Sequence, residues 1–99
     1  MSYGYIGSMR TQPGRRDEVI GLLLRSADAL KDHGCRAYVV ARAAGDPDLI
    51  WVTEVWTDKE AHDASLRLPA AQESIRAAMP LLTGEFTREE TEIAGGLGV

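Results

Sequence analysis

Residues 35–56, CRAYVVARAAGDPDLIWVTEVW, contain two runs of strand-forming residues separated by a turn. The runs at 35–43 and 49–56 are rich in Val, Tyr, Ile and Trp, which favour β-strands. Between them, Gly45-Asp46-Pro47-Asp48 consists of residue types that dominate tight turns. Because the connection is so short, we predict that the two strands pair as an antiparallel hairpin.

The sequence on either side of this hairpin predicts the remaining elements. Upstream, an alternating strand is followed by apolar residues at three- and four-residue spacing, which is typical of an amphipathic helix, here ended by Gly34. Downstream, Asp58 is a suitable N-cap, Pro69 suits the first turn of a further helix, and Pro80 should end or kink that helix. The predicted strands are 3–11 and 85–93, and the predicted helices are 15–32, 58–66 and 69–82.

These elements follow one another as β-α-β-β-α-β, with the second helical segment broken by a proline. That order is the ferredoxin-like arrangement of the α+β class, in which both helices cover one face of a four-stranded antiparallel sheet. Strand 49–56 is apolar on both faces, with Trp51 and Val55 on one and Val52 and Trp56 on the other. Since a sheet covered on one face only should have a polar second face, we expect two copies to pair sheet to sheet as a homodimer.

Length and composition narrow the classes of function. Ninety-nine residues fit a single domain, for which we expect residues 1–94, followed by a flexible tail, GGLGV, at 95–99. The net charge of −4 and the scattered arginines argue against nucleic-acid binding. No apolar run approaches the ~18 residues of a membrane span, and the N-terminus lacks the pattern of a signal peptide. We therefore expect a cytoplasmic location, which also suits a lone cysteine.

The residues that could ligate a cofactor are few. Cys35 is the only cysteine, and His33 and His62, the only histidines, are far apart in the sequence. A metal site needs several such ligands, and the phosphates of nucleotide cofactors are commonly held by a glycine-rich loop that this chain lacks. We therefore expect neither a metal nor a flavin.

Short motifs follow one another in a fixed order along nearly the whole chain. They are Pro13-Gly14 after the first strand, Gly34-Cys35 at the second, Glu54-Val55-Trp56 at the end of the third, DKEAHDASL at 58–66, Pro69, and MPLL at 79–82. This ordered set resembles the antibiotic biosynthesis monooxygenase (ABM) family of the dimeric α+β barrel superfamily.

The resemblance implies a small homodimer that oxygenates an anthrone, a quinol or a polyketide aromatic without metal or flavin. On this basis we expect a cofactor-independent monooxygenase whose partners are a small aromatic substrate, O2 and a second copy of the chain. Relatives also include haem-degrading enzymes, isomerases and proteins without an assigned activity. Two alternatives therefore stay open. They are a small-molecule-binding or regulatory dimer without chemistry, and an isomerase on the same scaffold.

The resemblance and the chemistry of the side chains indicate six candidate site residues. His62 would take the phenolic proton of the substrate, because an imidazole accepts a proton near neutral pH. Arg76 would steady developing negative charge, and Trp56 would stack against an aromatic ring. The expected substrate-binding set also includes Val52, Ser65 and Tyr38.

Three of these roles have a plainer alternative. Trp56 also fits a core position at the end of a strand. His62 also fits a half-exposed surface position beside Asp63, and Arg76 also fits a solvated pair with Glu73.

Other residues bear on the chemistry as well. The chain has no asparagine, which disfavours haem degradation, because the haem-degrading relatives use one near their site. Val52 stands where the anthrone oxygenases carry asparagine. Glu54 needs a partner if it is buried, and we expect Arg36 or Arg42 on the neighbouring strand to supply it. Two further tyrosines, Tyr3 and Tyr5, could line either the pocket or the dimer interface.

Overall fold

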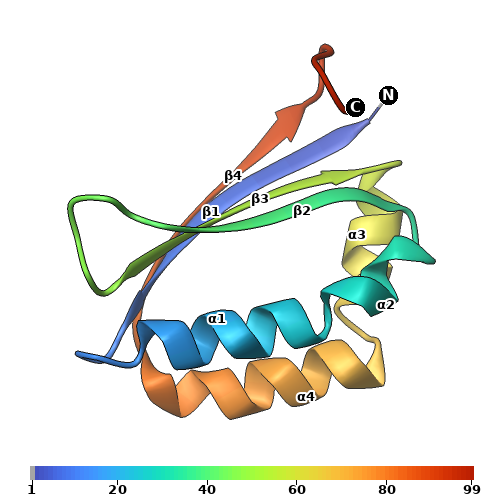
Figure 1. The fold of residues 1–99 in the computed structure, drawn as a ribbon. Helices are drawn as coiled ribbons and strands as arrows, with labels where there is room; N and C mark the ends of the chain where they lie inside the picture. The colour runs from blue at the N-terminus through green and yellow to red at the C-terminus, as the bar shows by residue number, and fades with distance from the viewer. Residues whose placement is uncertain (1) are drawn as a thin grey trace.

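Four strands form one antiparallel sheet in the computed structural model, which describes residues 2–99 (Figure 1). They are β1 (Tyr3–Thr11), β2 (Cys35–Arg42), β3 (Leu49–Trp56) and β4 (Leu82–Glu92). Their order across the sheet is β2-β3-β1-β4, and β2 and β3 pair as the predicted antiparallel hairpin. Met1, where the predicted domain begins, lies outside the described residues.

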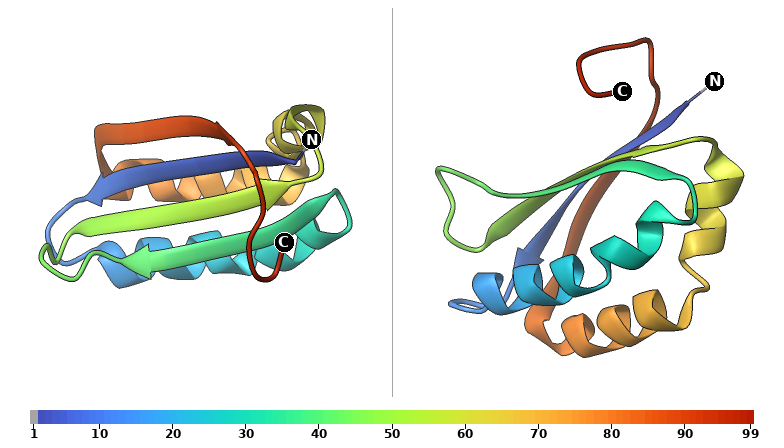
Figure 2. Two further views of the ribbon diagram at one scale, coloured as in Figure 1. Left: turned by 90° about the horizontal axis from the view of Figure 1, so that it is seen from above. Right: turned by 45° about the vertical axis from the view of Figure 1, so that its right-hand side comes forward.

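The helices all lie on one face of this sheet and leave the other face uncovered (Figures 1 and 2). They are α1 (Arg16–Arg25), α2 (Ala27–Lys31), α3 (Lys59–Ser65), α4 (Pro69–Ala78) and the short 3₁₀ helix η1 (Met79–Leu81). α1 and α4 lie side by side, whereas α2 and α3 lie near the end of β3. This arrangement confirms the ferredoxin-like α+β fold.

The segment predicted as one helix over residues 15–32 is two helices, because the chain bends at Ser26. The Ser26 hydroxyl donates a hydrogen bond of 3.3 Å to the carbonyl three residues earlier, and bonds of this kind compete with the helical ladder. Beyond the bend, Leu30 is buried against Tyr3 and Trp56. The prediction of a continuous helix was therefore wrong, since it could not include this tertiary contact.

The last strand also differs from its predicted span of 85–93. It begins at Leu82, which pairs with Thr11 beyond an irregularity in β1. Pro80 lies in η1 directly before it, so the proline ends α4 as expected. Residues 93–99 form neither helix nor strand.

Two groups of buried side chains hold the helices against the sheet. The larger group joins Val19 and Ile20 of α1 to Ile50 and Val52 of β3, with Ala78 and Leu81. The smaller group is Tyr3, Leu30 and Trp56. Fully burying a large apolar side chain contributes roughly 1.5–3 kcal/mol to stability. The core therefore occupies the covered face of the sheet.

The uncovered face carries large apolar side chains. Ile6 and Val39 both pair with Thr53, two residues from Trp51, so these four share one face. The exposed fractions of Ile6, Val39 and Trp51 are 39%, 55% and 41%. Contiguous apolar surface of this kind is typical of protein–protein contacts. The homodimer stays a prediction, and this face is where we expect its interface.

Candidate functional site

A cleft of about 900 Å³ lies on the helix-covered side of the sheet. Residues of all four strands and of α1 to α4 line it. Ligand pockets are typically ~300–1,000 Å³, so the cleft has room for a small polycyclic compound. Four of the six predicted site residues line it, namely Tyr38, Val52, His62 and Ser65.

His62 is a buried residue of this wall, with only 8% of its surface exposed. Its ring stacks on Tyr5 with centroids 5.0 Å apart and lies tilted against Tyr3 at 5.2 Å. Trp56 meets it edge-on, with centroids 5.6 Å apart and an interplanar angle of 83°. Stacked and edge-on rings at these distances attract one another. The alternative of a half-exposed surface histidine is therefore wrong.

The start of α3 determines which way His62 points. Asp58 caps the helix, because its carboxylate accepts a 2.7 Å hydrogen bond from the backbone N–H of Ala61. Four residues after the cap, His62 faces the sheet, and Ser65 follows on the same side one turn later. The predicted N-cap is confirmed, and it positions two residues that line the cleft.

A hydrogen bond fixes the protonation pattern of the His62 ring. Nδ1 lies 2.9 Å from Oδ1 of Asp63. Since an ionised carboxylate only accepts hydrogen bonds, Nδ1 carries the hydrogen of the neutral ring and Nε2 keeps the lone pair. This bond holds the pKa of Asp63 below its ordinary value, and Lys59, 3.4 Å away, acts in the same direction. In the neutral ring, Nε2 is therefore the nitrogen that can accept a hydrogen bond.

Lys59 connects Asp63 to the last strand of the sheet, β4. Its ammonium lies 3.2 Å from Glu90 of β4 and 5.6 Å from the centroid of the Tyr3 ring. Burial, followed by the charge of Glu90, raises the pKa of Tyr3 to about 12. The Tyr3 phenol therefore stays protonated at neutral pH, where it can donate a hydrogen bond but cannot act as a base.

Ser65 lines the cleft, but its hydroxyl hydrogen is already used. The Oγ atom donates a 2.6 Å bond to the backbone carbonyl of His62. Only its lone pairs remain for a ligand.

Trp56 is placed differently from its predicted role of stacking against a substrate. It has no exposed surface and is not among the residues that line the cleft. Its Nε1–H donates a 2.9 Å bond to Oε1 of Glu54, and its ring supports His62. Trp56 therefore lies behind the wall and contacts two residues that form it, because its large apolar ring fills the core beside Leu30.

Glu54 is not paired as predicted. Arg42 instead bonds Asp17 at 2.9 Å, and Arg36 forms no ion pair with any residue of 2–99. The side chain of Glu54 points to the covered side of the sheet and lines the cleft, while both arginines are exposed. The expected Glu54–arginine pair was therefore wrong, because alternation along the strands does not specify which partner a buried carboxylate will find.

The surroundings of Glu54 favour its neutral form. Burial raises the pKa of this carboxyl group, and the bond from Trp56 and the proximity of His62 only partly offset that rise. Burial also raises the pKa of the neighbouring Tyr38 phenol, with the Glu54 charge acting in the same direction. Reasoning from the sequence did not predict Glu54 as a site residue, although its two-residue spacing from both Val52 and Trp56 was a signal for it.

Arg76 is exposed on α4 and does not line the cleft. The alternative partner, Glu73, is also exposed, and the two form no ion pair within residues 2–99. The structure thus does not bring Arg76 to the other candidates. Tyr3 and Tyr5, by contrast, both line the cleft.

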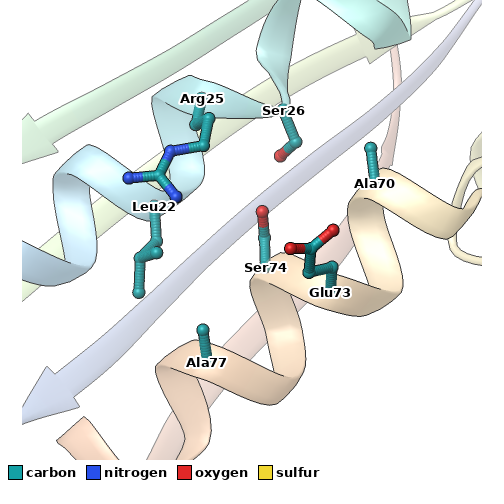
Figure 3. A pocket seen from close by; sticks show the side chains of 7 residues that line it. All are labelled: Leu22, Arg25, Ser26, Ala70, Glu73, Ser74 and Ala77. Carbon is teal, nitrogen blue, oxygen red and sulfur yellow. The ribbon is translucent and has the colours of Figure 1, made fainter.

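A second, smaller hollow of about 110 Å³ lies between α1 and α4 (Figure 3). Small side chains let the two helices approach there, and the two charged ones, Arg25 and Glu73, are exposed. Its lining is Leu22, Arg25, Ser26, Ala70, Glu73, Ser74 and Ala77. Since no buried titratable group lines it, the larger cleft is the candidate site.

Within residues 2–99, no three His, Cys, Asp or Glu side chains come together in a way that could hold a metal ion. In the same range, no helix is both long enough and apolar enough to span a bilayer. Function without a metal or flavin stays a prediction.

Comparisons with known proteins give the family. A crystal structure from Chloroflexus aurantiacus J-10-fl, of a protein that carries the name antibiotic biosynthesis monooxygenase, matches with a TM-score of 0.88. The two sequences are 45% identical, and the match covers 97% of this chain and 96% of that chain. A protein of the same family name from Caulobacter crescentus CB15 matches with a TM-score of 0.86 at 19% identity, over 95% of this chain and 91% of that one, and it supports the fold alone.

No significant match exists among the curated proteins. The sequence model of one family, described as antibiotic biosynthesis monooxygenase, matches residues 2–77, which is more than half of the chain. The resemblance inferred from the short motifs is thus confirmed, and this chain belongs to the antibiotic biosynthesis monooxygenase family.

Proposed function

We propose that this protein is a cofactor-independent monooxygenase that acts, as a homodimer in the cytoplasm, on a hydroxylated aromatic compound of the quinol, anthrone or polyketide type with O2. The observation that carries the proposal is the state of His62, which is buried in the cleft wall and bonded through Nδ1 to Asp63. Its family membership and the volume of the cleft agree with such a substrate.

The chemistry begins with a proton transfer. Nε2 of His62 takes a proton from the substrate, and the resulting anion is a much better electron donor to O2 than the neutral compound. One electron passes to O2, and the two radicals combine to form a C–O bond. The resulting peroxide anion takes the proton back from His62 and becomes a hydroperoxide.

The hydroperoxide then breaks down to the product. For an anthrone-type carbon, the remaining C–H proton leaves, the O–O bond breaks, and a carbonyl and a water molecule form. The sum is CH2 + O2 → C=O + H2O, in which O2 accepts all four electrons given up by the carbon. Tyr3 and Tyr5 flank His62 and are placed to contact the aromatic ring of the substrate.

The test is oxygen uptake by purified protein with a panel of hydroxyanthrones and quinols. We expect wild type to consume O2 and to form the quinone, and we expect His62→Ala to be slower by roughly 10²-fold, the low end for general base catalysis. His62→Gln should be similarly impaired, because an amide forms hydrogen bonds but does not accept the proton. The variants should regain part of their rate as the pH approaches the pKa of the substrate phenol.

His33→Ala is the matched control, because His33 is the other histidine and is exposed beyond the end of α2. It should behave as wild type. Unchanged rates in His62→Ala across pH 6–9 would show that another group acts as the base. Ligand binding without oxygen uptake for every member of the panel would instead favour the isomerase or the binding dimer.

A further inference from the structure

We propose that Glu54 is a second proton-transfer residue of the cleft, which donates a proton to the oxygen atom that leaves the substrate hydroperoxide. This role rests on the proposed function, because it assigns a residue to the last step of the same reaction.

The position of Glu54 in the sheet supports this role. It pairs with Tyr5 of β1 on one side and with Tyr38 of β2 on the other, and all three side chains line the cleft. The indole N–H of Trp56 donates a hydrogen bond to Oε1, which fixes the carboxyl group in one orientation. Glu54 therefore lies in the middle of the cleft wall, on a strand rather than on a mobile loop.

One carboxyl oxygen of Glu54 is left for a ligand. Within residues 2–99, Oε2 accepts no hydrogen bond from the protein. No side-chain oxygen or nitrogen in that range is both fully buried and without a partner, so Oε2 must be accessible from the cleft. A hydrogen-bonding oxygen that is held in place and reaches the ligand space is suited to proton transfer.

Burial, rather than the charge of a neighbour, favours the carboxylic acid form of Glu54 over the carboxylate. The titratable groups that face it are His62 of α3, Tyr5 of β1, and Tyr38 and Cys35 of β2, and within residues 2–99 no Lys or Arg forms an ion pair with it. Burial raises its pKa, so its acid form persists to a higher pH than that of an exposed glutamate. A carboxyl group that keeps its proton to a higher pH is better suited to protonate a leaving oxygen.

The breakdown of the hydroperoxide needs both an acid and a base. His62 takes the C–H proton while the O–O bond breaks, and Glu54 gives its proton to the departing hydroxide, which leaves as water. The proton on His62 then returns to Glu54, and both residues regain their starting state. His62 alone would have to remove one proton and supply another in the same step.

The experiment compares Glu54→Gln with wild type on a hydroxyanthrone. Glutamine keeps the acceptor for the Trp56 N–H but cannot donate an acidic proton. We expect the first-turnover oxygen uptake to persist, quinone formation to slow by roughly 10²-fold, and an organic hydroperoxide to accumulate. In wild type, quinone formation should fall as rising pH ionises Glu54, and this decline should be missing in the variant. Glu73→Gln, an exposed glutamate on α4, is the control.

Two results would overturn the inference. One is quinone formation by Glu54→Gln at the wild-type rate and with the wild-type pH profile. The other is the absence of a protonated-carboxyl band that depends on Glu54 in infrared difference spectra, which need no turnover. Binding of a hydroxyanthraquinone to wild type should shift the C=O stretch of a protonated carboxyl group, and this band should be missing in Glu54→Gln.

The infrared spectra also separate this inference from the proposed function. A shifted band without oxygen uptake would show that the acid form of Glu54 contacts the ligand, but it would reject the oxygenase and with it the role of Glu54 in hydroperoxide breakdown. Oxygen uptake without such a band would retain the oxygenase and reject Glu54 as the proton donor. If Glu54→Gln does not fold, Glu54→Asp serves in its place, since it withdraws the acid from the ligand by one methylene and should also slow quinone formation.

Discussion

At the scale of single residues, the two side chains proposed to transfer protons, the buried His62 and the half-buried Glu54, have different partners. His62 has an ionised partner, Asp63, at 2.9 Å, and three aromatic rings around it. Glu54 has a single neutral donor, the indole of Trp56. A carboxylate with so little compensation is costly to bury, so its proton is retained more strongly in the folded state than in the unfolded chain.

This difference predicts how stability depends on pH. Because the pKa of Glu54 is raised by folding, the native state binds more protons than the unfolded state above the ordinary glutamate pKa. Stability is therefore full at low pH and falls as the pH rises through the window between the unfolded and folded values. Glu54→Gln removes this loss, so its free energy of unfolding relative to wild type should rise with pH, as measured by urea denaturation from pH 4 to pH 8.

Glu73→Gln is the control for this measurement as well, because an exposed carboxyl group is not desolvated by folding. Its difference from wild type should stay nearly constant across the same range. A constant difference for Glu54→Gln would mean that the Glu54 carboxyl group is well solvated in the folded protein.

At the scale of elements, the site depends on the short helix α3. α3 has seven residues, and a helix of that length is unstable in isolation, so it relies on its cap and on packing. It carries Lys59, His62, Asp63 and Ser65, which are all residues of the cleft wall. Loosening its first turn should therefore affect the orientation of His62 more than a change elsewhere on the surface.

Asp58→Ala tests this dependence. The variant loses the hydrogen bond from the Ala61 N–H, and removal of such an N-cap costs about 1 kcal/mol of stability. Urea denaturation should show this loss, and Asp58→Ser should recover most of it because serine also caps helices. Asp28→Ala in α2 is the control, since Asp28 is exposed and makes no side-chain hydrogen bond or ion pair within residues 2–99. Equal stability of Asp58→Ala and wild type would show that packing alone determines where α3 begins.

At the scale of the whole molecule, the two faces of the sheet have different surroundings. The helices cover one face of the sheet (Figure 2). The other face exposes Ile6, Val39 and Trp51. A chain of 99 residues buries a smaller fraction of its surface than a larger protein does. Pairing through the uncovered face would remove this apolar surface from water.

We therefore expect light scattering to give twice the chain mass of 10.8 kDa at micromolar concentration. Val39→Lys should shift the protein toward the monomer, because it places a charge within the apolar face. Leu24→Lys is the matched control, since Leu24 is similarly exposed, at 50%, but lies on α1 away from that face. A wild-type protein that remains a monomer at this concentration would contradict the sheet-to-sheet dimer.

The sequence by itself determined the features that depend on neighbouring residues. The hairpin of 35–42 and 49–56 follows from strand propensity and a four-residue turn, and the starts of α3 and α4 follow from Asp58 and Pro69. These signals act within a few residues of the chain, so they can be read without knowledge of the fold. They were sufficient for the α+β class and the element order. The ordered motifs indicated the family, and four of the candidates derived from that resemblance, Tyr38, Val52, His62 and Ser65, line the cleft.

Only the tertiary structure decided how residues distant in the sequence meet. The bend at Ser26 depends on the burial of Leu30 against Tyr3, and the enclosure of His62 depends on rings from β1 and β3. The same holds for Glu54, which bonds Trp56 and faces the cleft, where the sequence predicted an arginine partner. Burial and partner choice arise from contacts between elements. Periodicity specifies the face of a strand on which a side chain lies, but not which group lies opposite to it.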